Sequence, residues 1–204
     1  MNRLFGTDGI RGRALEPPLD EPTVRRLGVA LSELLAHRRN LPRVLLAGDT
    51  RASTETLARW FGGSFQAAGG SVTWGGVLPT PAVSYLLKSG DFDAGIVISA
   101  SHNPAEDNGI KVLAPSGEKL SDEHETALEK RLGSIPEMMV GPELPERDRT
   151  LVDAYMDAVC ATHENPRPDR PSRSGQIPHQ PRLVRCPGAS RHCHHPRPDH
   201  YWRP

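Results

Sequence analysis

The apolar run Gly95–Ala100, followed at once by Ser101-His102-Asn103-Pro104, constrains the fold of this chain more than any other feature. A short, nearly continuous apolar run is typical of a β-strand that is covered on both faces. Pro104 lacks an N–H group and disfavours the helical conformation at Asn103, so the strand has to end in a turn. We therefore predict that Ser101 lies at the exposed end of a rigid strand, where a nucleophile is well placed.

A second turn is predicted at Asn108-Gly109, and Ile110–Leu113 can form another short strand after it. This arrangement brings the cation Lys111 back ten residues after Ser101. The ordinary alternative is that Ser101 is a surface serine in a polar turn.

The remaining pattern predicts strands that alternate with helices. The other expected strands are Val44–Ala47 and Ser71–Val77. Five helices are expected: Asp20 to Leu35, around Leu57–Ala68, after an N-cap at Thr80, Ser121 to Leu132, and Leu151–Val159. The second of these helices is expected to be interrupted at Gly62-Gly63. Such alternation predicts an α/β fold, a three-layer α/β/α sandwich with a mostly parallel sheet. The strand at 110–113 would make that sheet mixed. We expect Trp60 and Trp74 to pack in or against the core rather than to bind a ligand.

Composition restricts the classes of partner and location. The formal net charge of zero argues against a nucleic-acid partner recruited by overall charge. No stretch is long enough to span a membrane, and the N-terminus lacks the apolar core of a signal peptide. We expect a cytoplasmic enzyme without a membrane partner.

The composition changes sharply near Asn165. Residues 166–204 contain eight arginines and nine prolines but no lysine or glutamate, which contrasts with the acidic balance of residues 1–165. We predict one domain over 1–165 and a disordered tail over 166–204, because the tail has too little patterned apolar surface to offset its ordering entropy. The preferred explanation is a shifted reading frame after Thr162, and a natural disordered tail is the alternative. The cluster His192–His195 lacks the paired spacing of a metal site.

Three ordered motifs resemble those of the α-D-phosphohexomutase superfamily. The segment 95–111 is similar to the phosphoserine loop of this superfamily. The segment Phe5–Gly12 (Phe-Gly-Thr-Asp-Gly-Ile-Arg-Gly) is similar to the N-terminal loop of its phosphoglucosamine mutase branch. The segment Gly48–Arg51 is similar to a third loop, which follows a strand. Because three matches in separate loops are more specific than any one alone, the resemblance is strong. Asp8 favours the glucosamine branch, since the glucose and mannose branches more often have serine there.

The resemblance implies that Ser101 carries a phosphate and donates it to a phosphosugar. Phosphoserine brings strong negative charge and three acceptor oxygens, which need cations nearby. We expect Arg11 and Arg51 to bind phosphate through their planar guanidinium groups, and Lys111 to contact phosphate or to exchange a proton. An Asp-x-Arg pair after a strand can also be a local salt bridge, so the role of Arg51 stays open between the two.

The resemblance also implies substrate or phosphate contacts for Thr7, Asp8 and Asn103, and a turn that the Asn103 side chain holds in place. His102 adjoins Ser101 and superficially suggests a hydrolase pair. Neighbouring residues on an extended chain point to opposite sides, and no Gly-x-Ser-x-Gly motif is present. We expect His102 to orient the phosphate or the sugar instead.

Relatives in this superfamily bind Mg²⁺ and use a hexose bisphosphate as activator, here a hexosamine bisphosphate. The resemblance assigns one Mg²⁺ ligand to this chain, the phosphate oxygen of Ser101. No Asp-x-Asp-x-Asp-Arg run, which would supply the other metal ligands, occurs in the sequence. Three hypotheses remain: a truncated and inactive phosphoglucosamine mutase domain, the same chemistry on glucose or mannose phosphate, and a non-catalytic remnant that only folds or binds phosphate.

Overall fold

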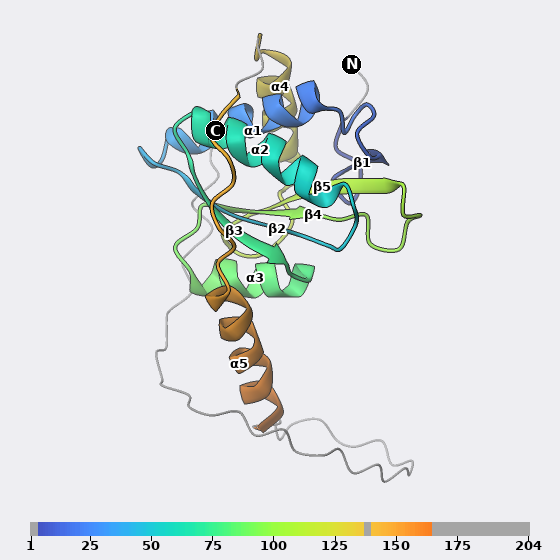
Figure 1. The fold of residues 1–204 in the computed structure, drawn as a ribbon. Helices are drawn as coiled ribbons and strands as arrows, with labels where there is room; N and C mark the ends of the chain where they lie inside the picture. The colour runs from blue at the N-terminus through green and yellow to red at the C-terminus, as the bar shows by residue number, and fades with distance from the viewer. Residues whose placement is uncertain (1–3, 137–139, 165–204) are drawn as a thin grey trace.

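The computed structural model describes residues 4–136 and 140–164, which form one mixed sheet between two layers of helices (Figure 1). The elements in chain order are β1 (Ile10–Arg13), α1 (Glu21–Ala36), β2 (Arg43–Gly48), α2 (Thr54–Ala67), β3 (Ser71–Val77), α3 (Thr80–Ser89), β4 (Ala94–Ile98), β5 (Asp107–Leu113), α4 (Asp122–Gly133) and α5 (Thr150–Glu164). The predicted three-layer α/β/α sandwich is confirmed.

The sheet has the strand order β1-β5-β4-β2-β3. β2 pairs in parallel with both β3 and β4, whereas β5 runs antiparallel to both β4 and β1. The expectation that the strand after the serine loop makes the sheet mixed is therefore confirmed. β1 was not predicted as a strand, because its four residues are stabilised by pairing with a segment that lies a hundred residues away, as in Ile10 opposite Ile110.

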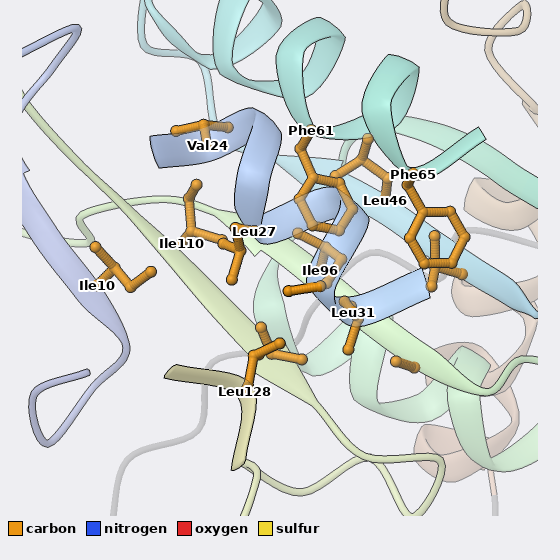
Figure 2. Packing of buried hydrophobic residues seen from close by; sticks show 14 of the residues in the cluster. Ile10, Val24, Leu27, Leu31, Leu46, Phe61, Phe65, Ile96, Ile110 and Leu128 are labelled. Atoms are coloured by element: carbon orange, nitrogen blue, oxygen red, sulfur yellow. The ribbon is translucent and has the colours of Figure 1, made fainter. Parts of the chain in front are cut away.

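Two apolar clusters form the core, one on each face of the sheet. Ile96 and Ile98 face the cluster shared with α1, α2 and α4, whereas Val97 faces the cluster shared with α3 and α5. This alternation follows from the two-residue period of a strand and explains why the run reads as continuously apolar. Figure 2 shows the first cluster, in which Phe61 and Phe65 of α2 stack over the sheet with their ring centroids 5.9 Å apart. As expected, Trp60 and Trp74 pack against this cluster.

The glycine pair Gly62-Gly63 does not interrupt α2, contrary to the sequence prediction. Both glycines are buried, and the segment that follows α4 crosses directly over them: a Cβ atom on Gly62 would lie 2.4 Å from Leu144, and one on Gly63 would lie 3.0 Å from the carbonyl of Pro142. Glycine lowers the stability of a helix, but a larger residue at either position would exclude the crossing segment.

Two local predictions are wrong. Thr80 is the first residue of α3 rather than its N-cap, and Pro79 occupies the cap position. Asn108-Gly109 is not a turn, because β5 already begins at Asp107. Gly109 instead allows close packing within the sheet, since a Cβ atom there would lie 2.8 Å from the carbonyl oxygen of Ser99. By contrast, Ser121 caps α4 as predicted, with its hydroxyl accepting a hydrogen bond from the His124 N–H group at 3.4 Å.

The predicted disordered tail over 166–204 and the cluster His192–His195 lie outside the described residues. The domain boundary at 165 stays a prediction. Within 4–136 and 140–164, no helix has the combined length and apolarity that crossing a membrane requires.

Candidate active site

The strand arrangement brings the three sequence motifs to one edge of the sheet. β2 and β4 are parallel neighbours, so the residues that follow them, Asp49–Arg51 and Ser99–Ser101, leave the sheet at the same edge. β5 begins at this edge, and Arg11 of β1 lies opposite Gly109 of β5. Arg11 and Arg51 both donate to Asn103 of the serine loop, so the three loops meet at this edge.

Ser101 is exposed three residues beyond the end of β4 and has an unusual backbone conformation. Its φ angle is +59°, in the left-handed region that residues other than glycine seldom adopt. The Ser101 N–H group donates to the hydroxyl of Ser99 at 3.0 Å, and the N–H group of Asn103 donates to the Ala100 carbonyl at 3.2 Å. Surrounding contacts thus hold the serine in a conformation that it would not favour by itself.

Arg51 provides the largest set of those contacts. Its Nε donates to Asp49 Oδ2 at 3.1 Å, and Nη2 donates to the carbonyls of Ser101 at 3.1 Å and Asn103 at 2.8 Å. Nη1 donates to the Pro104 carbonyl and, at 3.0 Å, to the Asp107 carbonyl. A guanidinium group has five N–H donors, and all five are used on the protein itself. The geometry favours the local salt-bridge alternative, in which Arg51 holds the loop, over direct phosphate binding.

Asp49 fixes the position of the Arg51 side chain. Its Oδ1 accepts hydrogen bonds from the Arg51 backbone N–H group at 3.1 Å and from the Thr54 hydroxyl at 2.9 Å. Partial burial acts to raise the pKa of Asp49, but the hydrogen bonds from the Arg51 backbone, the Ser99 and Thr54 hydroxyls and the Arg51 side chain together lower this pKa below its ordinary value. The carboxylate is therefore held in its charged form.

Arg11 approaches the serine loop from the other side. Its Nη1 donates to the Ala100 carbonyl at 2.9 Å and to Asn103 Oδ1 at 3.2 Å, and its Nη2 donates to Asp8 at 2.7 Å. The guanidinium group therefore contacts residues on both sides of Ser101. Arg11 Nε is buried and has no hydrogen-bond partner among the described residues.

Asp8 connects the N-terminal loop with Lys111. The same Oδ2 atom that accepts from Arg11 also accepts from Lys111 Nζ at 3.1 Å. The Asp8 side chain is 60% exposed, and the hydrogen bond and charge of Lys111, helped by Arg11, lower its pKa. Two cations thus share one exposed carboxylate.

A tight turn presents Asp8 and Thr7 at the surface. The Gly6 N–H group donates to the Gly9 carbonyl at 3.0 Å, and Thr7 and Asp8 lie exposed between these glycines. Gly9 has a φ of +93°, and a Cβ atom there would lie 2.4 Å from the Ile110 carbonyl oxygen, so the turn requires glycine. This requirement explains the glycine of the motif on physical grounds.

The other predicted residues lie in the same loop. The Asn103 side chain donates to Asp107 at 3.1 Å, which agrees with its expected role in holding the turn. His102 is exposed, and within the described ranges it makes none of the side-chain hydrogen bonds that hold the loop. Nothing in this geometry pairs His102 with Ser101 as a catalytic base.

Several supporting residues were not identified from the sequence. Asn108 is fully buried and donates to the hydroxyls of Ser53 at 2.8 Å and Thr54 at 3.3 Å, which ties β5 to the start of α2. Glu129 of α4 accepts hydrogen bonds from the N–H groups of Leu4 at 2.7 Å and Phe5 at 2.6 Å, which anchors the segment before the loop that carries Asp8. Asn108 lies within the segment 95–111, where the sequence predicts a turn, and Glu129 belongs to no local motif, so only the fold shows what these two residues hold.

Comparison with known families agrees with this geometry. A protein-family model described as phosphoglucomutase/phosphomannomutase, alpha/beta/alpha domain I, matches residues 2–138. The chain belongs to this family. The matched residues include all three loops described above.

Individual relatives show the extent of the similarity. A phosphoglucosamine mutase of Solibacter usitatus is 45% identical over 140 residues, which are 69% of this chain and 31% of the relative. A phosphoglucosamine mutase of Paenarthrobacter aurescens is 45% identical over 168 residues, covering 79% of this chain and 37% of the relative. The chain therefore spans about a third of the length of these curated relatives.

A solved structure supports the fold independently. The phosphoglucomutase/phosphomannomutase family protein from Burkholderia thailandensis superposes with a TM-score of 0.65 at 26% identity, covering 78% of this chain and 35% of that chain. The α/β/α architecture and the family assignment therefore rest on both sequence and structure.

Proposed function

We propose that this chain provides the phosphoserine domain of a phosphoglucosamine mutase, an isomerase that interconverts glucosamine 6-phosphate and glucosamine 1-phosphate. The observation that carries the proposal is the exposed Ser101, whose loop contacts Arg11 while Arg11 and Lys111 share the carboxylate of Asp8. The relatives named phosphoglucosamine mutase, with identities of 45%, support the choice of substrate.

In this proposal, a phosphate on Ser101 takes the place of Asp8 as the partner of the two cations. A phosphoserine carries about −1.5 to −2 charges, whereas the aspartate carries one. Because Asp8 is 60% exposed, releasing it to solvent costs little. Arg11 can then donate to phosphate oxygens through Nη2, the atom that now contacts Asp8, and Lys111 acts as a phosphate contact or a proton shuttle.

The proposed reaction consists of two phosphoryl transfers that balance. The bond between Ser101 Oγ and phosphorus breaks as a bond forms between phosphorus and a sugar hydroxyl oxygen, and the hydroxyl proton passes to Ser101 Oγ. The bisphosphate then reorients. The bond between its other phosphorus and the sugar oxygen breaks as that phosphorus bonds to Ser101 Oγ, and the serine proton passes to the sugar oxygen. Such transfers depend mainly on positioning and on neutralisation of charge, which the fixed loop and its cations would supply.

The described residues do not by themselves form a magnesium site. Among residues 4–136 and 140–164, no group of three histidine, cysteine, aspartate or glutamate side chains could hold a metal ion. The one ligand that we propose from this chain is a phosphate oxygen on Ser101.

We also propose that a polypeptide of these 204 residues does not turn over phosphosugars alone. Its sequence contains no Asp-x-Asp-x-Asp-Arg run for the metal. A coupled assay for glucosamine 1-phosphate, run with magnesium and a hexosamine bisphosphate, should show no rate above background. Measurable turnover would contradict this part of the proposal. The cytoplasmic location, and the absence of nucleic-acid and membrane partners, stay predictions.

Mutase activity on glucose or mannose phosphate is the second candidate. The match to the phosphoglucomutase/phosphomannomutase domain and the similarity to the Burkholderia thailandensis protein support it. Asp8 favours the glucosamine reaction, as stated above. A non-catalytic domain that only binds phosphate is a third candidate.

A chimeric enzyme tests the proposal directly. Residues 2–138 of this chain would replace the matching segment of the Solibacter usitatus phosphoglucosamine mutase, which is 45% identical over the aligned region. The chimera should convert glucosamine 6-phosphate, and Ser101→Ala should abolish conversion while the circular dichroism spectrum stays unchanged. Turnover with glucose or mannose phosphate alone would favour the second candidate.

Ser89→Ala serves as the matched control. Ser89 is an exposed serine at the end of α3, and its hydroxyl donates only to helix carbonyls, those of Tyr85 at 3.2 Å and Leu86 at 3.4 Å. The control chimera should keep full activity. A folded chimera that is inactive with all three hexose phosphates, or one in which Ser101→Ala keeps substantial activity, would refute the mutase assignment.

A further inference from the structure

We propose that Arg51 is a positioning residue that holds the loop of residues 101–107, which carries Ser101, in its reactive conformation and does not bind phosphate. We call this set of Arg51 contacts the lock. This inference rests on the proposed function, because it concerns the reactivity of Ser101. The reason is that every donor of the Arg51 guanidinium group already has a partner in the protein, four of them carbonyl oxygens of residues 101–107.

The loop has few backbone hydrogen bonds of its own, and its other contacts include those of Arg11 with Asn103, of the Asn103 side chain with Asp107 and of the Ala14 N–H group with the Glu106 carbonyl. Within residues 101–107, Asp107 donates to the Pro104 carbonyl at 3.1 Å, and Asn103 donates outside the range to the Ala100 carbonyl at 3.2 Å. Pro104 contributes no donor. A loop with so few internal backbone bonds needs an external partner to hold one conformation, and the guanidinium group of Arg51 is placed to be that partner.

The lock is itself anchored to the sheet. The Asp49 N–H group donates to the Ile98 carbonyl at 3.0 Å, which joins the ends of β2 and β4. The Asp49 carboxylate then holds both the backbone and the Nε of Arg51. The Arg51 side chain is only 11% exposed, so its contacts are shielded from solvent competition.

The consequence for Ser101 is conformational. Its φ of +59° is unfavourable for serine, and the hydrogen bond from Arg51 Nη2 to the Ser101 carbonyl acts on that same residue. The lock therefore keeps Ser101 between the two residues that Arg11 contacts, Ala100 and Asn103. Without the lock, the serine should relax and leave the cations.

Lysine cannot replace Arg51 in this role. Its ammonium group is a single point with three donors, whereas the planar guanidinium group reaches four carbonyls and a carboxylate at once. A phosphate ligand would behave differently, since lysine also binds phosphate well. Arg51→Lys therefore separates a lock from a simple cationic contact.

The first measurement is hydrogen exchange of the loop in the complete 204-residue chain. In Arg51→Lys, the backbone amides of residues 101–107 should exchange at least about ten-fold faster, while the core strands keep their protection. The matched control is Arg59→Lys on α2, because Arg59 is 56% exposed and donates to Glu55 at 2.7 Å. The control should leave the loop unchanged.

The second measurement reports the chemical environment at position 101 and needs no enzymatic turnover. A thiol introduced by Ser101→Cys should be alkylated at an unusually low pH because cations lie nearby, and peptide mapping distinguishes it from the native cysteines. Adding Arg51→Lys should slow alkylation at neutral pH by at least about three-fold. A purely structural role of Arg51 elsewhere in the fold would not change this pH profile.

The outcomes separate the lock from the proposed function. If Arg51→Lys leaves both the exchange and the alkylation profile unchanged, the lock is refuted, even where Ser101→Ala proves Ser101 to be the nucleophile. If both change but the chimera has no mutase activity, the proposed function fails and the lock stands. Should Arg51→Lys not fold, Asp49→Asn provides a milder loss of the same anchor: faster loop exchange supports the lock, and unchanged exchange overturns it.

Discussion

Arg51 and the pair Arg11–Lys111 lie at the same edge of the sheet, yet the structure uses their charges in opposite ways. Arg51 is 11% exposed and has all its donors on the loop and on Asp49. Arg11 and Lys111 share Asp8, whose side chain is 60% exposed. The first cation is fixed in the framework, whereas the other two hold a partner that a stronger anion can replace.

Under the proposed function, this difference would let a phosphate site be both ordered and ready for its ligand. Hydrogen bonds from Arg51 to backbone carbonyls hold the serine loop, and the exposed carboxylate of Asp8 would occupy the cations until a phosphate replaced it. Changes to Arg11 and Lys111, the exchangeable pair, should therefore affect mainly the rate of phosphoryl transfer. Changes to Arg51, the fixed arginine, should affect mainly the order of the loop and the free energy of unfolding.

The largest effect is expected from the exchangeable pair in the chimeric enzyme. Lys111→Ala should lower the mutase rate by about 10²–10⁴-fold, the usual range for an acid–base or electrostatic group. Loop hydrogen exchange should stay at the wild-type level, because Lys111 bonds to Asp8 and not to the 101–107 carbonyls. A normal rate would remove Lys111 from the proposed site.

The stability of two arginine variants sharpens the comparison. Arg51→Ala should lower the free energy of unfolding by about 3 kcal/mol, because it leaves Asp49 and four carbonyls without their partner in a shielded site. Arg11→Ala should cost less, about 1–2 kcal/mol, since its ion pair with Asp8 is exposed and it gives only two hydrogen bonds to the loop. Urea denaturation measures both values, and equal losses would contradict the division into fixed and exchangeable cations.

Low pH should weaken the contacts that hold the loop of residues 101–107, because Asp49 becomes protonated. Its pKa is lowered in the folded chain, so the stability that its charge contributes is fully present above the ordinary value of 3.8 and is lost as the pH falls through the lower, folded pKa. Loop exchange, corrected for its intrinsic pH dependence, should therefore rise only below pH 3.8. In Asp49→Asn this additional rise should be absent. Loosening that begins near neutral pH would point to another group.

The smallest expected effect concerns the backbone of Ser101. Ser101→Gly should relieve the left-handed strain at φ +59° and raise the free energy of unfolding by up to about 1 kcal/mol, offset in part by the greater freedom of glycine in the unfolded chain. Ser101→Ala keeps the strain and serves as the control. Lower stability for glycine than for alanine would show that the loop does not strain this residue.

The sequence was sufficient to predict the layered fold and the exposed turn that holds Ser101. The apolar run before Ser101, the capping serine of α4 and the three motifs each predict a local feature that the structure contains. Each of these signals depends on a few neighbouring residues, which is why they can be read without the fold.

Features that depend on distant contacts could not be predicted in this way. In the sequence, nothing local distinguishes Arg51 from Arg11 and Lys111, the cations of the other two motifs. Only the fold shows that Arg51 donates to carbonyls about fifty residues away along the chain. The pair Asn108-Gly109 has the sequence of a turn, but burial against α2 and close packing in the sheet place it inside β5. Gly62-Gly63 lies within α2, and the close approach of the segment around Leu144 explains why glycine stands there.

The most direct test of the account is the structure of the same 204-residue chain with phosphoserine incorporated at position 101. We predict that Asp8 releases Arg11 and Lys111, that both cations contact the phosphate, and that Arg51 keeps its bonds to Asp49 and to the loop carbonyls. A phosphate bound by Arg51, with Asp8 still holding Arg11 and Lys111, would contradict the account.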